Sequence, residues 1–229
     1  MKRELGLPAH IQACLFDLDG VITQTAKVHA QAWKQTFDEF RIPFDIVPDY
    51  AAYVDGKPRG DGVRSVLIAR GIEATPELVD GIASKKDQLF VDLIHRHGVQ
   101  TYDGSVRYVR AARASGLKIA VVSSSKHTTE VLRAAALDGD FDVQVDGNVA
   151  EQEHLRGKPA PDTYLAAART LHTLPANAAV YEDALAGVEA GRAGHFGLVV
   201  GIDRAGQAAA LRAHGADIVV RDLAQLMNS

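Results

Sequence analysis

Short apolar runs recur along the chain, and glycine or polar residues bound each of them. Five runs have the length and β-branched content of buried parallel strands, and they span residues 13–18, 117–122, 178–181, 197–202 and 217–220. Segments with helical spacing of apolar positions separate them and often end at glycine, as C-caps do; they span residues 105–114, 128–136, 162–171, 184–193 and 206–214. This alternation predicts an α/β fold with a doubly wound parallel sheet.

The alternation is interrupted after the first predicted strand. From about residue 26 to residue 98 the chain has helical patterns at 28–40, 62–70 and 76–97 and almost no strand pattern. An insert at this point should rise from the carboxyl edge of the sheet, where open α/β folds bind ligands. We therefore predict a catalytic core of residues 1–24 and 99–229 and an inserted helical cap of residues 25–98.

The composition is that of a globular protein, with 47% hydrophobic and 24% charged residues among 229. A net charge of −4 argues against a nucleic-acid binder, which usually needs a basic face. The one cysteine, Cys14, lies in an apolar run, so we expect a buried thiol and no internal disulfide. Neither a signal-type apolar segment nor a membrane span is apparent. We expect a cytoplasmic monomer that binds neither membrane nor nucleic acid.

Two carboxylates, Asp17 and Asp19, follow the first apolar run directly. Alternation along a strand would point both side chains to one side. Burying an unpaired carboxylate is unfavourable, so the position of Asp17 implies a cation nearby. The alternative is a simple Asp-Gly turn at Gly20 in which a carboxylate caps the backbone.

Polar residues also follow two later strands, at Ser123 and at Glu182 and Asp183. Together with Asp17, the two later acids form an oxygen-rich set that suits Mg²⁺. Lys158 precedes a predicted helix and could bring a positive charge to the same edge, or be an ordinary surface lysine. Ser123 could donate to a phosphoryl oxygen, cap the next helix, or do both.

In their order along the chain, these residues resemble the four motifs of the haloacid dehalogenase superfamily. The motifs are Asp17-x-Asp19-Gly20-x-x-Thr23, Ser123, Lys158 and Glu182-Asp183. Residues 16–26 with His29, Ala32, Trp33 and Lys34, and also residues 123–126 and 157–162, resemble the β-phosphoglucomutase-like subfamily. The resemblance covers nearly the whole chain and implies a Rossmann-like core under a helical cap.

The resemblance also implies a role for each matching residue. Asp17 would be the nucleophile and a metal ligand, and Asp19 the general acid and base that also gives its backbone carbonyl to Mg²⁺. Glu182 and Asp183 would complete the metal site. The transferring phosphoryl group would be bound by Ser123 and Lys158, with a backbone contact from Ser124. The distal phosphate would be bound by Arg59, Ser125 and Lys126. Thr25 and His29 would help to place Asp19.

The residues alone leave the cap assignments open. Arg59 could be an ordinary surface charge, although an arginine fork suits a phosphate. His29 and Trp33 lie four residues apart on a predicted helix, so either could belong to a packed face, and for Trp33 we favour packing. Asp55 stands where the subfamily pattern has a lysine, and the pattern also differs at Gln24 and His127.

The implied activity is a Mg²⁺-dependent β-phosphoglucomutase. Such an enzyme would convert β-glucose 1-phosphate to glucose 6-phosphate through phospho-Asp17 and a bisphosphate intermediate, with a small phosphorylated sugar as its partner. A phosphatase with the same covalent step and water as the acceptor is the alternative. A non-catalytic phospho-receiver is disfavoured, because a receiver needs no lid whereas a mutase benefits from excluding water.

Overall fold

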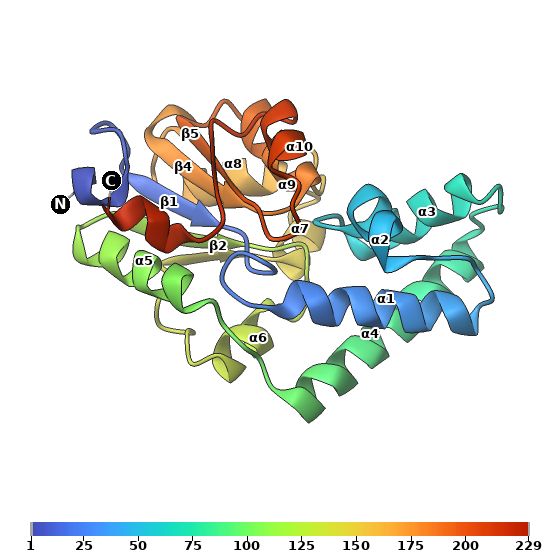
Figure 1. Cartoon of the computed structure of the whole chain (residues 1–229). Helices are drawn as coiled ribbons and strands as arrows, with labels where there is room; N and C mark the ends of the chain where they lie inside the picture. The colour runs from blue at the N-terminus through green and yellow to red at the C-terminus, as the bar shows by residue number, and fades with distance from the viewer. Residues whose placement is uncertain (1, 229) are drawn as a thin grey trace.

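The centre of the molecule is a parallel sheet of six strands (Figure 1). The computed structural model describes residues 2–228. The strands follow the order β3-β2-β1-β4-β5-β6, with bounds β1 (Ala13–Phe16), β2 (Lys118–Val122), β3 (Val143–Val145), β4 (Ala178–Glu182), β5 (Leu198–Ile202) and β6 (Ile218–Val220). Because β1 pairs with both β2 and β4, the ends of these three strands lie side by side.

Helices cover both faces of the sheet, as the doubly wound prediction requires. Cys14 and Phe16 of β1 belong to one core, with the helices α5 (Asp103–Ala114) and α6 (Thr128–Ala134) and the 3₁₀ helix η4 (Leu223–Asn228). Ala13 and Leu15 belong to the other, with the helices α8 (Asp162–Thr170), α9 (Leu185–Ala193) and α10 (Ala208–Ala213). Alternate residues of one strand therefore serve opposite cores, and the predicted fold class is confirmed. The thiol of Cys14 is buried, as expected.

A separate group of helices extends beyond the carboxyl ends of the strands (Figure 1). It consists of α1 (Thr25–Glu39), α2 (Ile46–Asp49), the π-helix η2 (Tyr50–Val54), α3 (Arg59–Ala69) and α4 (Pro76–His97). These helices share their own hydrophobic cluster, which includes Trp33 and Phe37. The cluster supports the division into core and cap, whose boundaries stay a prediction.

Local signals explain why the cap helix α4 has the predicted ends. The Thr75 hydroxyl accepts a hydrogen bond from the N–H of Leu78, and Pro76 occupies the first turn, where its missing N–H is not needed. Gly98 follows the helix with a φ of 69°, a conformation that glycine adopts without strain. None of the helices in residues 2–228 combines the length and apolarity needed to span a bilayer.

The sequence pattern did not predict seven short elements, namely α2, η2 and η4, whose bounds are given above, and the four that follow. Strand β3 has three residues, two of them only partly buried, and α7 (Gly147–Gln152) buries none of its residues. Short elements without a repeated apolar face carry no periodic signal. The 3₁₀ helices η1 (Lys2–Leu5) and η3 (Pro175–Asn177) are shorter than a periodicity can detect. The first strand also ends at Phe16 instead of Leu18, so Asp17 begins the loop that follows it.

Candidate active site

Three buried carboxylates meet where β1 and β4 end. Asp17, Glu182 and Asp183 can each offer an oxygen within 4.8 Å of the other two, and their residues are at most 5% exposed. The N–H of Asp17 donates to the carbonyl of Tyr181 at 3.0 Å, which fixes the two strand ends against each other. The structure therefore brings together the acids that the sequence placed at strand ends.

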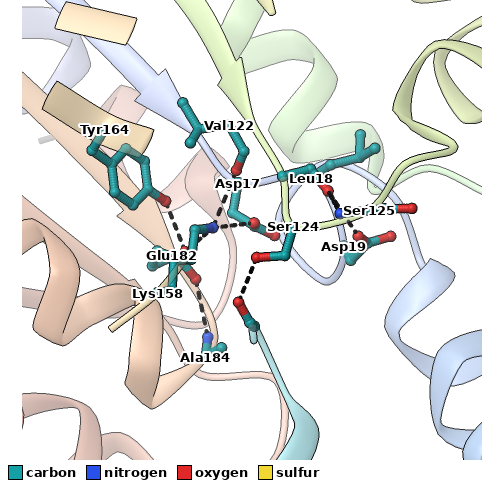
Figure 2. Close-up of polar contacts among 12 residues, drawn as sticks. Asp17, Leu18, Asp19, Val122, Ser124, Ser125, Lys158, Tyr164, Glu182 and Ala184 are labelled. Atoms are coloured by element: carbon teal, nitrogen blue, oxygen red, sulfur yellow. Dashed lines mark hydrogen bonds and ion pairs between the residues drawn. The ribbon is translucent and has the colours of Figure 1, made fainter. Parts of the chain in front are cut away.

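Lys158 lies inside this acid cluster and is not the surface lysine of the alternative interpretation. Its Nζ is 2.6 Å from an oxygen of Asp17 and 2.6 Å from an oxygen of Glu182, and only 2% of the residue is exposed. Tyr164 donates to the same Glu182 oxygen at 2.7 Å (Figure 2). Burial opposes the charge on Lys158, but the two carboxylates raise its pKa above the ordinary value. The lysine is a fixed positive charge beside the proposed nucleophile.

One lysine does not balance three acids. Burial raises the pKa of Asp17 and outweighs the lowering by Lys158, and Glu182 raises that pKa further. Burial and neighbouring carboxylates also raise the pKa of Asp183, whose Oδ1 is buried without a hydrogen-bond partner. An excess of buried negative charge and an unpartnered carboxylate oxygen are what a cation would satisfy. The donor set is all oxygen, so it fits Mg²⁺.

Asp19 has different surroundings from Asp17. Its carboxylate accepts from the hydroxyl of Thr25 and, at 3.3 Å, from that of Ser123, and it lies 3.4 Å from Nε2 of His29. Burial acts to raise the pKa of Asp19, but His29 and Thr25 together lower it to about 2. Asp19 is therefore ionised at neutral pH. The helix α6 has His127 as its N-cap, so Ser123 does not cap it.

A cap residue that the sequence reasoning missed is Lys86 on α4. Its Nζ is 2.5 Å from Nδ1 of His29 and lies over the rings of Trp33 and Phe90. Burial and the charge of Arg59 lower its pKa to about 7. Lys86 lies four residues from both Ile82 and Phe90, which are buried on α4. That spacing was the available signal, because it puts a lysine on the apolar face.

The cap and the core together line one cavity that includes Asp17 and Asp19. Arg59, Ser125 and Lys126 also line it. Both cations have partners within the chain: Arg59 lies 2.5 Å from Asp87, and Lys126 lies 2.7 Å from Glu151. The Ser125 hydroxyl accepts from the N–H of His127 at 3.2 Å. The predicted distal-phosphate residues thus share a cavity with Asp17, the proposed nucleophile.

The loop that follows η2 brings a further acid to this cavity. Burial and Glu182 raise the pKa of Asp55 to about 7, in spite of a hydrogen bond with Tyr50 that lowers it. Lys57 bonds the carbonyl of Ala52 at 3.3 Å. The Ser124 hydroxyl donates to the carbonyl of Gly56 in the cap at 2.7 Å.

His29 and Trp33 both pack within the cap, and His29 also lies beside Asp19. Trp33 is buried and stacks on Phe37, with ring centroids 5.4 Å apart, as packing predicts. His29 stacks on Phe90 at 3.9 Å while its Nε2 faces Asp19. Packing and a place beside the proposed acid and base are therefore compatible for His29.

A buried nucleophile-type aspartate, a fixed lysine and an acid cluster under a helical cap define a phosphoryl-transfer enzyme of the α/β class. Residues 11–195 match the family model of the haloacid dehalogenase-like hydrolases, and the chain belongs to this family. Within it, the chain belongs to the β-phosphoglucomutase-like subfamily.

Two β-phosphoglucomutases match over nearly their full length. The chain is 49% identical to the β-phosphoglucomutase of Mycobacterium tuberculosis (strain CDC 1551 / Oshkosh), covering 99% of this chain and 95% of the relative. It is 35% identical to the β-phosphoglucomutase of Bacillus subtilis (strain 168), covering 94% and 92%. The crystal structure of β-phosphoglucomutase from Clostridium difficile is similar, with a TM-score of 0.82, 27% identity and coverage of 94% and 93%.

Proposed function

We propose that the protein is a β-phosphoglucomutase, which converts β-glucose 1-phosphate to glucose 6-phosphate. The observation that carries the proposal is a shared cavity: the cations Arg59 and Lys126 line it together with Asp17. A mutase must hold a bisphosphate by both of its phosphates, and the lining of this cavity includes both basic side chains and the proposed nucleophile. The similarity to β-phosphoglucomutases over 99% of the chain supports the same activity.

The first half-reaction starts from phospho-Asp17. The C6 hydroxyl oxygen of β-glucose 1-phosphate attacks the phosphorus, the bond from phosphorus to the Asp17 oxygen breaks, and Asp19 takes the hydroxyl proton. This step gives glucose 1,6-bisphosphate and a free Asp17 carboxylate. Asp19 can take this proton because its carboxylate is ionised at neutral pH, with His29 and Thr25 lowering its pKa.

The second half-reaction uses the bisphosphate in the opposite orientation. Asp17 attacks the phosphorus at C1, the bond from that phosphorus to the sugar oxygen breaks, and Asp19 returns its proton to the oxygen. Glucose 6-phosphate leaves and phospho-Asp17 is restored. Lys158 and Ser123 are the proposed ligands of the moving phosphoryl group.

Mg²⁺ would be held by the carboxylates of Asp17, Glu182 and Asp183 and the backbone carbonyl of Asp19. Its chemistry in such a site is to neutralise the charge of the phosphoryl oxygens. The unpartnered oxygen of Asp183 supports this ligand set. We also expect the enzyme to be a cytoplasmic monomer.

The test is to supply β-glucose 1-phosphate with a trace of glucose 1,6-bisphosphate and to measure glucose 6-phosphate and free phosphate together. A mutase forms glucose 6-phosphate in large excess over free phosphate, and Arg59→Ala should lose this activity. Stoichiometric release of phosphate from several sugar phosphates, with Arg59→Ala barely affected, would mean that the enzyme is a phosphatase.

A further inference from the structure

We propose that Gly157 is a specificity-determining residue, because its lack of a side chain lets the cap seat closely enough to keep water from phospho-Asp17. The contact is with the cap loop, defined as residues 55–58. The inference rests on the proposed mutase function. It concerns which acceptor, sugar hydroxyl or water, receives the phosphoryl group.

The cap loop touches three loops of the core. The Ser124 hydroxyl, after β2, donates to the carbonyl of Gly56 at 2.7 Å, a bond that Figure 2 draws. After β4, a Cβ on Gly56 would lie 2.9 Å from the Cβ of Ala184. At the third loop, a Cβ on Gly157 would lie 2.0 Å from Cγ and 2.6 Å from Cδ of Pro58. These three contacts involve a serine hydroxyl, an alanine methyl group and a proline ring.

These three core loops are the ones that carry the proposed phosphoryl site. Ser123 precedes Ser124, Lys158 follows Gly157, and Glu182 and Asp183 precede Ala184. The cap loop therefore contacts the same three loops that carry the proposed ligands of the reacting group. The contact of Pro58 with Gly157 is one residue along the chain from Lys158, whose Nζ lies 2.6 Å from the Asp17 carboxylate.

An alanine at position 157 cannot fit while the cap stays where it is. Real carbon atoms do not approach to 2.0 Å, so the Pro58 ring and its loop would have to retreat by roughly 1 Å or more. Pro58 is also the N-cap residue of α3, and Arg59 is the first residue of that helix. The retreat would both admit water and displace the proposed distal-phosphate ligand.

Water and the sugar hydroxyl are chemically equivalent acceptors. With water, the phosphorus-to-Asp17 bond breaks, a bond to the water oxygen forms, Asp19 takes one water proton, and inorganic phosphate leaves. The bonds broken and formed in hydrolysis are of the same kind as those in transfer to the sugar. Only the position of the sugar and the exclusion of water can favour transfer.

The experiment compares Gly157→Ala, Pro58→Ala, the double variant and the matched control Gly139→Ala. Gly139 is an exposed turn residue, and a Cβ there would meet no atom within 4 Å. Pro58→Ala removes Cγ and Cδ, and the remaining Cβ would lie at an ordinary 3.5 Å from the new methyl group. The measured quantity is the ratio of free phosphate to glucose 6-phosphate, from β-glucose 1-phosphate with a trace of the bisphosphate.

We expect Gly157→Ala to raise this ratio by roughly 10- to 100-fold, because a displacement of about 1 Å can lower an oriented reaction by about that much. Gly139→Ala should stay near the wild-type ratio. Pro58→Ala removes ring atoms from the contact without displacing the loop, so it should raise the ratio less than Gly157→Ala, and the double variant should lie closer to wild type than Gly157→Ala does. A wild-type ratio in folded Gly157→Ala would overturn the inference. A double variant with the same raised ratio as Gly157→Ala would also overturn it, because the increase would then come from a local shift of Lys158 and not from the contact with Pro58.

Two further measurements keep the outcomes distinct. A wild-type enzyme that forms no glucose 6-phosphate refutes the proposed function and not the role of Gly157. If Gly157→Ala fails to fold by circular dichroism, Ser124→Ala provides the second test, since it removes the bond to Gly56 without adding an atom. An unchanged ratio in Ser124→Ala would then overturn the inference.

Discussion

Replacing Lys158 with methionine should destabilise the metal-free protein strongly. The change removes the Nζ that lies 2.6 Å from both Asp17 and Glu182 and keeps a side chain of similar length. Removing one partner of a buried ion pair typically costs about 3 to 5 kcal/mol, because the other charge is left uncompensated. For a chain of this size, that loss corresponds to a fall of roughly 10 °C in the unfolding midpoint.

The matched control is Lys34→Met. Lys34 is exposed and pairs with Asp38 one helical turn away, at 2.6 Å, so its loss should cost only about 0.5 kcal/mol. Thermal unfolding in excess chelator, monitored by circular dichroism, gives the loss of stability in Lys158→Met and in Lys34→Met. Added Mg²⁺ should stabilise Lys158→Met more than the wild type, because the cation meets three acids without a competing lysine.

Two results would refute the reasoning about Lys158. A loss below about 1 kcal/mol would mean that the acid cluster is already solvated or neutral. Equal stabilisation of both proteins by Mg²⁺ would mean that the lysine and the metal do not share the same carboxylates.

Two other predictions follow from the surroundings of single groups. Asp19→Asn should lower turnover by roughly 10²- to 10⁴-fold, the usual contribution of general acid and base catalysis; near wild-type turnover would leave Asp19 only a shaping role in its turn. At the junction of cap and core, the hydrogen bond to Asp87 raises the pKa of His127; burial opposes this, and the charges of Asp87 and then Glu130 add to the rise. A raised pKa stabilises the fold only while the imidazole is protonated, so the stability difference between wild type and His127→Gln should be fully present below about pH 6.5. It should disappear as the pH rises through the raised pKa, and denaturant titrations that show a constant difference would contradict this.

The placement of the acids at the sheet edge could be predicted because short linear motifs carry them. Asp17, Ser123 and Glu182 each follow an apolar run, and parallel strands bring their carboxyl ends to one edge. The prediction of a doubly wound sheet needed only the periodicity of its longer strands. Strand β3 was missed because the polar Gln144 interrupts its three residues, whereas the equally short β6 is a continuous apolar run.

The cap contacts could not be predicted in the same way, because they depend on tertiary packing. The pairing of Arg59 with Asp87 joins the first residue of α3 to the middle of α4, and no local pattern relates the two positions. Lys86 looks like an ordinary helical lysine until its buried face is known. The contact of Pro58 with Gly157 joins segments about a hundred residues apart, so it depends wholly on how the cap sits on the core.

The central claim, that Asp17 is the residue that carries the phosphoryl group, is tested most directly by mass spectrometry of the enzyme itself. The protein is incubated with glucose 1,6-bisphosphate and Mg²⁺, quenched in acid, and the phosphorylated peptide is located. The account predicts one phosphoryl group on Asp17, absent in Asp17→Asn and absent in excess chelator, while circular dichroism reports an intact fold. A phosphoryl group on another residue, or labelling and full turnover in Asp17→Asn, would contradict it.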